Sequence, residues 1–379
     1  MAVVLAASQV RTCFGDGDQT FAALCRGDSG VAPLRHPDPA GINVRYGYHG
    51  DGGGPFLASR WLVDCVRRAV AEADLRPGRQ RVVALVGTGL RELAAVEEWA
   101  VAGREVPRHR LHFRDALAEA VPGLADIITI ANACSAGGHA LALAQDLVEM
   151  GEADAVVAAA ADGMTSSMLA MIGRVADVPT ERVRPFDAAR QGVLLGEGAA
   201  AAVVVSETTA RSGLARLLAT GLSCDAYHET APDVAGICRA MRDALSRGDR
   251  SAADVDLVVA HGTGTALNDP TECAALRQVL RDGGGDPLIT AIKGAVGHTS
   301  GSAGLVSLDV AVRCLASGVV PPVVGLRTVL PEGDGLRFAL QPVRVSPRLV
   351  QVDAFGFGGV NAVTLLEPLP GGARWPAST

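Results

Sequence analysis

The sequence contains almost no lysine. It has 34 lysine and arginine residues, and Lys293 is the single lysine, so the remaining 33 are arginines. Because all the other basic positions hold arginine, the one retained ammonium group indicates a requirement that a planar guanidinium does not meet. Lys293 lies in the segment TAIKGAVGHTSGSAG (290–304), five residues before His298. We therefore treat Lys293 as a candidate site residue.

Paired cysteines and long apolar runs are also missing. The eight cysteines are scattered and include no CxxC pair, which is typical of reduced thiols rather than of a disulfide framework. No charge-free stretch of about 18 apolar residues occurs, so we expect no membrane span. The opening MAVVLAAS is too short for a signal peptide, lacks a basic segment before it, and is more typical of a first strand. These features predict a cytoplasmic protein.

Charge and composition narrow the possible partners. The net charge of −7 argues against nucleic acid or an anionic membrane as the main partner. Hydrophobic residues make up 49% of the chain and charged residues 20%, which allows a large core and is unlike a disordered chain. With 379 residues, the chain is long enough for two domains or for one large duplicated domain.

Short β-branched runs alternate with helical patterns rich in alanine, leucine and arginine, which is typical of layered α/β proteins. We expect strands at 82–86, 127–130, 203–205, 257–259, 288–292 and 362–366. We expect helices at 57–73, 138–150, 235–246, 271–280 and 304–315.

Two passages of the chain repeat the same order of parts. In the first, the strand VVALV runs into a GTG turn, and the strand IITIA then leads to Cys134 and a helix. In the second, DLVVA runs into HGTG, and LITAI then leads to Lys293, His298 and another helix. This repetition suggests two copies of one topology, at 1–210 and 211–379. Opposed copies would bring their strand-end loops to one site.

Cys134 lies between a buried-looking strand and a helix that opens with small residues, in NACSAGGHALALAQDLV. At a helix N-terminus the dipole favours a thiolate, and the N–H of the residue can point at an oxyanion. A free cysteine is also a common small apolar residue in a tight core. The position alone leaves both interpretations open.

The segment AHGTGTALNDPTE places His261 at the end of a β-run, before glycines that allow the backbone to approach a ligand closely. The hydroxyls of Thr263 and Thr265 could bond the amides of a long substrate. The alternative is a glycine-rich turn with a structural, hydrogen-bonded histidine. A phosphate loop is weakly supported, because no complete Walker or dinucleotide motif surrounds the segment.

A metal site is the competing interpretation of these groups. No pair of them has zinc-finger spacing, and His109-x-x-His112 is an isolated half-site in a polar segment. We therefore expect no metal. One cysteine, two histidines and one lysine on strand-end loops form instead a coherent site for thiol-bound acyl groups.

Six segments carry a family resemblance. They are NACSAGG, RPFDAARQGVLLGEGAAAAVV, SCDAYHETAP, HGTGTALNDPTE, IKGAVGHTSGSAG and DAFGFGGVNAV. In order and rough spacing, the chain resembles the elongating, Cys-His-His branch of the β-ketoacyl-(acyl carrier protein) synthases over nearly its whole length. The resemblance implies an α/β fold of the thiolase type, a five-layered αβαβα sandwich made of two duplicated halves. Such a fold would also explain the repeated order of parts.

The resemblance implies a role for each matching residue. Cys134 would be the nucleophile that takes an acyl chain from carrier-bound phosphopantetheine as a thioester. His261 and His298 would promote decarboxylation of the extender and stabilise the enolate. The backbone N–H groups of Cys134 and Phe355 would form the oxyanion hole. Lys293 would lie behind the histidine and the cysteine in a buried polar network.

The resemblance also implies the reaction and its substrates. Thr263 and Thr265 match the threonines that hold pantetheine, and Asp225 and Thr230 lie in a segment that resembles a second gating loop. The implied reaction is a decarboxylative Claisen condensation of an acyl thioester with a malonyl-type extender, in polyketide, polyene or specialised lipid biosynthesis. It implies no cofactor apart from the phosphopantetheine that carries the substrates.

The implied partners are an acyl carrier protein and a second subunit, in a homodimer or in a heterodimer with a related synthase chain. Three departures from the family pattern matter. Ser307 stands where a glutamate of the lysine network is common, and Ala136 stands where serine or threonine is common. The segment 90–120 is short and unlike the usual helical segment, which shapes the acyl pocket and the dimer contact.

Two other functions remain open at this point. A synthase-like acyltransferase would form the Cys134 thioester and pass the acyl group to an amine or an alcohol, and Ser307 permits this reading. A non-catalytic partner subunit, like the chain-length subunits of active synthases, would typically lack the nucleophile. The presence of Cys134, both histidines and Lys293 argues against the non-catalytic alternative.

Overall fold

The computed structural model describes residues 2–36, 41–174, 178–210 and 213–369. The strands of the first half are β1 (Val3–Arg11), β2 (Ala32–Pro33), β3 (Tyr46–Gly47), β4 (Val82–Gly87), β5 (Asp126–Ile130), β6 (Ala155–Asp162) and β7 (Gly198–Ser206). Its helices are α1 (Gly17–Arg26), α2 (Leu57–Glu72), α3 (Leu93–Ala102), α4 (Arg114–Ala120), α5 (Ala136–Glu149) and α6 (Ser166–Arg174).

The second half has a similar set of elements. Its strands are β8 (Ala215–Cys224), β9 (Leu257–Val259), β10 (Leu288–Thr290), β11 (Val319–Val320), β12 (Arg337–Phe338), β13 (Val343–Arg344), β14 (Val350–Gly356) and β15 (Val360–Glu367). Its helices are α7 (Val234–Arg247), α8 (Asn268–Leu276), α9 (Lys293–Val296) and α10 (Ala303–Ser317).

The main sheet shows that the two halves repeat one topology. Its strand order is β12-β10-β9-β14-β15-β8-β1-β7-β6-β4-β5. In the first half, β7 is antiparallel to β1 and β6, whereas β6, β4 and β5 are parallel. In the second half, β15 is antiparallel to β8 and β14, whereas β14, β9 and β10 are parallel. The two sets join where β1 pairs antiparallel with β8, and the expected boundary at 210/211 falls between β7 and β8.

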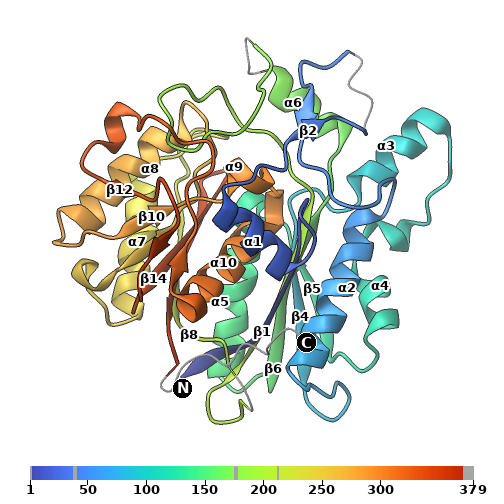
Figure 1. Cartoon of the computed structure of the whole chain (residues 1–379). Helices are drawn as coiled ribbons and strands as arrows, with labels where there is room; N and C mark the ends of the chain where they lie inside the picture. Colours follow the sequence, from blue (N-terminus) through green and yellow to red (C-terminus); the bar gives the residue numbers. More distant parts are fainter. Residues whose placement is uncertain (1, 37–40, 175–177, 211–212, 370–379) are drawn as a thin grey trace.

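Helices divide the molecule into layers. α5 and α10 lie in the middle of the molecule (Figure 1), where they pack against each other and against strands of both halves. α2 and α4 cover the other face of the first-half strands, and α7 and α8 cover the other face of the second-half strands. The arrangement is the five-layered αβαβα order that the resemblance implies.

Small residues allow the central helices to approach the strands. A Cβ atom on Gly138 of α5 would lie 2.6 Å from the Cβ of Ala362, and one on Gly304 of α10 would lie 3.2 Å from the Cβ of Ala354. The strands β6 (AVVAAAAD) and β7 (GAAAAVVVS) are buried throughout and rich in alanine for the same reason. Alanine favours helices intrinsically, so the sequence prediction missed β6 and found only the valine end of β7.

Two further boundaries differ from the prediction. The helix expected at 271–280 is regular only to Leu276, and a π-helical turn follows over Arg277–Arg281. The strand expected at 288–292 ends at Thr290, because the chain turns there into the short helix α9, which begins at Lys293. Among the described residues, no helix is long and apolar enough to cross a membrane.

Candidate active site

Cys134 lies in a 3₁₀ turn, Ala133–Ser135, directly before α5. Ala133 has a φ of 47°, a left-handed conformation that is costly for a residue with a side chain. A Cβ atom on Gly87 would lie 2.6 Å from the backbone of Ala136, so glycine lets the end of β4 support this turn. The thiol is thus held at the N-terminus of a central helix, and the residue is 8% exposed.

The second half builds the same turn before α10, over Ser300–Ser302, where Ser300 has a φ of 50°. The loops of the two halves meet here, because a Cβ atom on Gly301 would lie 2.7 Å from the backbone nitrogen of Gly89. Asp162, at the end of β6, accepts hydrogen bonds from the N–H groups of Gly89 (2.8 Å) and Gly301 (2.7 Å). The structure therefore brings strand-end loops from both halves to one place, as the repeated sequence pattern predicts.

His261 and His298 lie together, with ring centroids 5.5 Å apart and planes nearly perpendicular at 83°. The Ser300 N–H donates to Nδ1 of His298 (3.2 Å), and the Lys293 ammonium lies 3.2 Å from Nδ1 of His261. An ammonium has only donors, so both Nδ1 atoms accept and both rings carry their proton on Nε2. Burial and the charge of Lys293 lower the pKa of both histidines well below the usual range. Both rings are therefore neutral Nε2–H donors.

Lys293 is buried behind these groups, with 2% of its surface exposed. Besides Nδ1 of His261, its ammonium contacts the carbonyl oxygen of the same residue. Burial lowers the pKa of Lys293 to about 8, while Glu272 and Cys134 act in the opposite direction. The single lysine thus contacts the histidine loop, and its charge lowers the pKa of the Cys134 thiol.

Two buried carboxylates of α8 were missed by the sequence reasoning. Glu272 accepts hydrogen bonds from the N–H groups of His261 (2.7 Å) and Gly262 (2.8 Å), and Asp269 accepts one from Thr263 (3.0 Å). Burial raises the pKa of Glu272 to about 7. The signal was present in the NDPTE segment, since two acids three residues apart share one face of a helix that directly follows the HGTG loop.

The two threonines of the HGTG loop are in contact. The hydroxyls of Thr263 and Thr265 lie 2.8 Å apart, and Nε of Arg190 donates to the carbonyl oxygen of Thr265 (3.0 Å). Thr263 is buried, whereas Thr265 is half-buried. The pair therefore leads from the histidines toward the surface of the molecule.

The backbone N–H that faces the Cys134 thiol is not the one that was expected for an oxyanion hole. The N–H that hydrogen-bonds Cys134 belongs to Phe357 and not to Phe355. Phe355 pairs with Asn361 inside the β14–β15 ladder, and its ring lies 5.5 Å from the ring of His261. Phe357 lies just beyond the end of β14, in the turn that faces the thiol. The sequence motif alone does not reveal where the strand ends.

The Cys134 thiol is not ionised at rest. Burial raises its pKa to about 11, although Lys293 and the Phe357 N–H act in the opposite direction. A neutral thiol can therefore give up its proton only as it reacts, when its charge passes to the acyl group.

Asp225 and Thr230 lie on the loop that covers the turn after β14. Asp225 accepts hydrogen bonds from Nδ2 of Asn361 (2.6 Å) and from the N–H of Asp233 (3.0 Å). A Cβ atom on Gly359 would lie 2.5 Å from the Cβ of Asp225, so the two loops are in close contact. Thr230 is exposed. These residues adjoin the Phe357 turn rather than the histidines.

The three departures from the family pattern are visible in the structure. Ser307 of α10 is 1% exposed, and its hydroxyl has no hydrogen-bond partner in the part of the chain that is described. Ala136 is buried in the first turn of α5. The segment 90–120 forms α3 and α4, with a 3₁₀ turn, Arg108–Leu111, between them.

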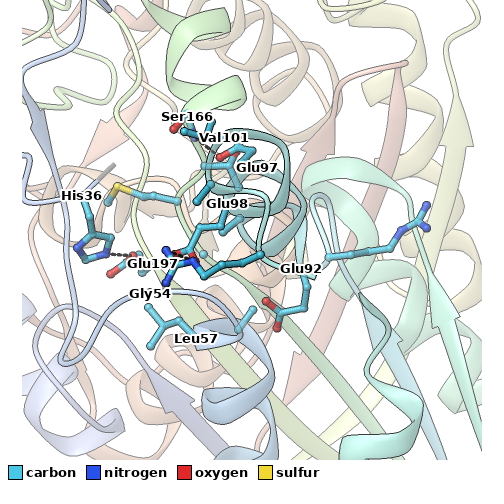
Figure 2. Close-up of a pocket in the computed structure, with 17 residues that line it drawn as sticks. His36, Gly54, Leu57, Glu92, Glu97, Glu98, Val101, Ser166 and Glu197 are labelled. Carbon is cyan, nitrogen blue, oxygen red and sulfur yellow. Dashed lines mark hydrogen bonds and ion pairs between the residues drawn. The ribbon is translucent and has the colours of Figure 1, made fainter. Parts of the chain in front are cut away.

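A pocket of about 270 Å³ opens between α2, α3 and the loop before α6, and Figure 2 shows its lining. His36 points at Glu197 across this pocket, with Nε2 of His36 lying 3.1 Å from Oε1 of Glu197. Glutamates of α3, Glu97 and Glu98, line the opposite wall. None of the site residues predicted from the sequence lines the pocket, so it is separate from the thiol and the histidines.

His36, His49 and Glu197 form the one group of possible metal ligands among the described residues, with ligand atoms within 4.8 Å of one another. Nε2 of His49 accepts a hydrogen bond from the Arg35 N–H (3.3 Å), so the proton of this ring is on Nδ1, facing Glu197. Although burial raises the pKa of Glu197, the hydrogen bond with His36 and the nearby ring of His49, whose Nδ1 lies 3.6 Å from Oε2, bring it to about 2. Glu197 therefore lies between the rings of two histidines.

Comparisons with known families and proteins agree with this geometry. Residues 57–210 match the model of "Beta-ketoacyl synthase, N-terminal domain" and residues 214–327 that of "Beta-ketoacyl synthase, C-terminal domain". The chain is 36% identical over 242 residues to nodulation protein E of Rhizobium meliloti, over 62% of this chain and 60% of that protein. It is 30% identical over 343 residues to the actinorhodin polyketide putative beta-ketoacyl synthase 1 of Streptomyces coelicolor, over 82% of this chain and 73% of that protein. The chain therefore spans about 60% of the length of nodulation protein E.

Solved structures share the whole fold. The ishigamide ketosynthase/chain length factor superposes with a TM-score of 0.87 at 30% identity, over 97% of this chain and 99% of that chain. AntDE:AntF, a type II PKS acyl-carrier protein in complex with its ketosynthase bound to the hexaketide, superposes with a TM-score of 0.87 at 21% identity, over 97% of this chain and 99% of that chain. The fold class expected from the sequence is confirmed.

Proposed function

The chain belongs to the β-ketoacyl synthase family, and from this premise we propose that it condenses an acyl thioester with a malonyl-type extender, with loss of CO₂. The observation that carries the proposal is the convergence of Cys134 from one half with His261, His298 and Lys293 from the other. A nucleophile alone would be sufficient for acyl transfer. Two neutral Nε2–H donors beside it can stabilise an enolate.

The first step is acyl transfer to Cys134. The Cys134 sulfur attacks the carbonyl carbon of the carrier-bound thioester and loses its proton, and the carrier thiol leaves and takes up a proton. The backbone N–H groups of Cys134 and Phe357 stabilise the oxyanion that forms in between. Lys293 favours the transient negative charge on sulfur, because its positive charge lowers the pKa of the thiol.

The second step is the condensation. The extender carboxylate leaves as CO₂, and its electron pair forms an enolate whose oxygen accepts hydrogen bonds from Nε2–H of His261 and His298. The enolate carbon attacks the Cys134 thioester, the sulfur–carbon bond breaks, and the thiolate is reprotonated from solvent. Neutral imidazoles suit this step, because an imidazolium would protonate the carbanion. The product is a β-ketoacyl thioester that is two carbons longer.

We propose that the substrates arrive on an acyl carrier protein. A similar structure is that of a ketosynthase in complex with its acyl-carrier protein. Thr263 and Thr265 lie on the path from the histidines to the surface, where their hydroxyls can bond the amides of phosphopantetheine. The relatives support a place in polyketide or lipid biosynthesis, since one is a putative synthase of actinorhodin polyketide.

We further propose a second subunit at β5. Among the described residues, β5 is the end strand of the main sheet and pairs only with β4. Ile128 on this strand is 39% exposed, and an unpaired apolar edge invites strand pairing. The partner is a second copy of this chain or a related subunit, as in the ketosynthase/chain length factor pair.

Light scattering should give a dimer for the wild type, a monomer for Ile128→Glu and a dimer for Ile128→Val. A wild-type protein that is monomeric alone and with related subunits would contradict the proposal.

Intact-mass spectrometry tests the reaction in two additions. Acyl-carrier protein alone should add one acyl mass to the protein, and later addition of malonyl-carrier protein should remove that mass and yield an extended β-ketoacyl carrier. An acyl adduct that malonyl-carrier protein leaves in place would favour transfer to an amine or an alcohol instead. Absence of any adduct would favour a non-catalytic partner subunit.

A further inference from the structure

Asp162, the last residue of β6, is a carboxylate buried where the strand-end loops of the two halves touch; it is 1% exposed. Its Oδ1 accepts hydrogen bonds from the hydroxyl of Thr88 (2.7 Å) and the N–H of Leu90 (2.9 Å). Its Oδ2 accepts from the N–H groups of Gly89 (2.8 Å) and Gly301 (2.7 Å). Burial raises the pKa of Asp162, and these donors act in the opposite direction. Because the donors occupy all the lone-pair positions of a carboxylate, the arrangement suits the ionised group.

The N–H of Gly301 has a counterpart in the first half. In each turn a residue with a left-handed φ comes first, Ala133 at 47° and Ser300 at 50°. The next N–H belongs to Cys134 in the first half and to Gly301 in the second. In the proposed reaction the N–H of Cys134 stabilises the oxyanion of the substrate. The equivalent N–H of the second half donates instead to Asp162, a carboxylate of the protein itself.

This bond lies one residue from the contact that orients His298. The N–H of Ser300 donates to Nδ1 of His298 at 3.2 Å. The backbone of His298 is fixed separately, because its N–H donates to the carbonyl oxygen of Leu194 and its carbonyl oxygen accepts from the N–H of Gly196, both at 2.9 Å. These backbone bonds do not set the tautomer of the ring, which therefore depends on the N–H of Ser300.

Ser300 adopts a conformation that its surroundings must support. A left-handed φ is unfavourable for a residue with a Cβ atom and persists where neighbouring contacts hold it. Two such contacts are present: a side chain on Gly89 would collide with Oγ of Ser300, and Asp162 accepts the next N–H along the chain. Asp162 thus connects the turn of Ser300 to the ends of β4 and β6 in the first half.

Activation of the thiol does not explain Asp162. Burial is the main cause of the raised pKa of Cys134, and the negative charge of Asp162 acts in the same direction. A carboxylate that disfavours the thiolate does not assist acylation. The contribution of Asp162 to the reaction therefore lies in the hydrogen bonds that it accepts.

We propose that Asp162 is a positioning residue for His298: it holds the N–H of Gly301, so that the neighbouring N–H of Ser300 donates to Nδ1 of His298 and the ring keeps its proton on Nε2, the donor for the enolate. This inference rests on the proposed function in one respect, since that function gives the Nε2–H donor its task. The first half then supplies both the nucleophile and the anchor for a histidine of the second half.

The ¹⁵N signals of the His298 ring test the proposal without any substrate. Protonated and unprotonated imidazole nitrogens have well-separated ¹⁵N shifts, and the signals of His298 are those that disappear in His298→Ala. In the wild type we expect the proton on Nε2 at neutral pH. In Asp162→Ala the N–H of Gly301 loses its acceptor. We therefore expect the Nδ1 signal to move toward the protonated value as the second tautomer becomes populated.

The conservative variant Asp162→Asn should restore the signals of the wild type. Its amide oxygen can accept from Gly89 and Gly301, while its NH₂ group faces Thr88, whose hydroxyl can turn to accept. Only the hydrogen bond from Leu90 is then lost. Signals in Asp162→Asn that match those of Asp162→Ala would overturn the proposal, because the charge and not the acceptor would then matter.

Asp309→Ala is the matched control. It also removes a fully buried carboxylate, but that carboxylate contacts Ser8 and Arg313 and not the turn before α10. The His298 signals should therefore stay at their wild-type positions. A shift as large as that of Asp162→Ala would overturn the proposal, because any loss of a buried charge would then produce it.

Single-turnover kinetics follow the same variants. Condensation should be about tenfold slower in Asp162→Ala, and acylation of Cys134 should change less, since acylation does not use His298. Wild-type His298 signals in folded Asp162→Ala would overturn the proposal. Shifted signals in a protein whose wild type does not condense would support the positioning role and refute only the proposed function.

If Asp162→Ala does not fold, the wild type still decides. The proposal requires an Nε2–H tautomer for His298 and slow hydrogen exchange of the Gly301 amide. A proton on Nδ1, or rapid exchange of that amide, would overturn it.

Discussion

The two halves of the molecule build the same backbone turn and fill it differently. α5 begins after Ala133, with φ of 47°, and α10 begins after Ser300, with φ of 50°. The next residue is Cys134 in the first half and Gly301 in the second. The first half thus presents a reactive side chain at its helix N-terminus. The second half has no side chain at that position, and its histidines and lysine come from the neighbouring loops.

This difference shows that packing, not the duplicated backbone, decides where the chemistry lies. A side chain on Gly301 would collide with the backbone of Gly89, so the second turn cannot carry a nucleophile while the loops of the two halves touch. Asp162 stabilises that contact, because it accepts hydrogen bonds from both loops. Two copies of one fold therefore form one site.

Replacing the nucleophile should have the largest effect. Cys134→Ala removes the only group at the site that can form the thioester, so we expect no acyl adduct by intact mass after incubation with acyl-carrier protein. Cys224→Ala, which removes an exposed thiol, is the matched control and should retain the full adduct. An adduct of undiminished yield on Cys134→Ala would show that the reactive residue lies elsewhere.

The variant Lys293→Arg tests whether the site needs more from Lys293 than its positive charge. Lys293→Arg places a larger planar group in a buried site and leaves donors unpaired, at about 1–3 kcal/mol for each unsatisfied group. We expect a folded dimer in which single-turnover condensation is at least about tenfold slower. The exposed exchange Arg79→Lys should be silent. Condensation at the parent rate in Lys293→Arg would mean that charge alone is required.

Adding a side chain at Gly301, in the turn of the second half, should have a smaller effect, mainly on stability. Gly301→Ala forces a Cβ atom to within 2.7 Å of the backbone nitrogen of Gly89. Overpacking of this kind costs about 1–3 kcal/mol, which urea denaturation would measure as a loss in the free energy of unfolding. Gly163→Ala, where a Cβ atom would meet nothing within 4 Å, is the control. Equal stability of both variants would contradict the close contact between the halves.

Local patterns in the sequence predict much of this site, because they coincide with its local structure. The strand-end loops with Cys134, His261 and His298 are visible as β-branched runs that stop at glycines. The single lysine is visible from composition alone. By contrast, β6 escaped prediction because its alanines favour helices intrinsically, and only close packing under α5 makes them a strand.

The missed residues depend on contacts between distant segments. Asp162 acquires its role only when Gly89 and Gly301, far apart in the sequence, come together. The choice between Phe355 and Phe357 for the oxyanion hole depends on where the β14–β15 ladder ends, which the motif does not specify.

The central claim is that the two steps depend on different side chains, acylation on Cys134 and enolate stabilisation on the histidines. Single-turnover acylation and condensation, measured separately for His261→Ala and His298→Ala, test it most directly. We predict that both variants form the Cys134 thioester at nearly the parent rate, while condensation falls by about 10²–10³, the usual cost of removing one oxyanion donor. Condensation at the parent rate in either variant, or loss of acylation together with condensation, would contradict this assignment of the two steps.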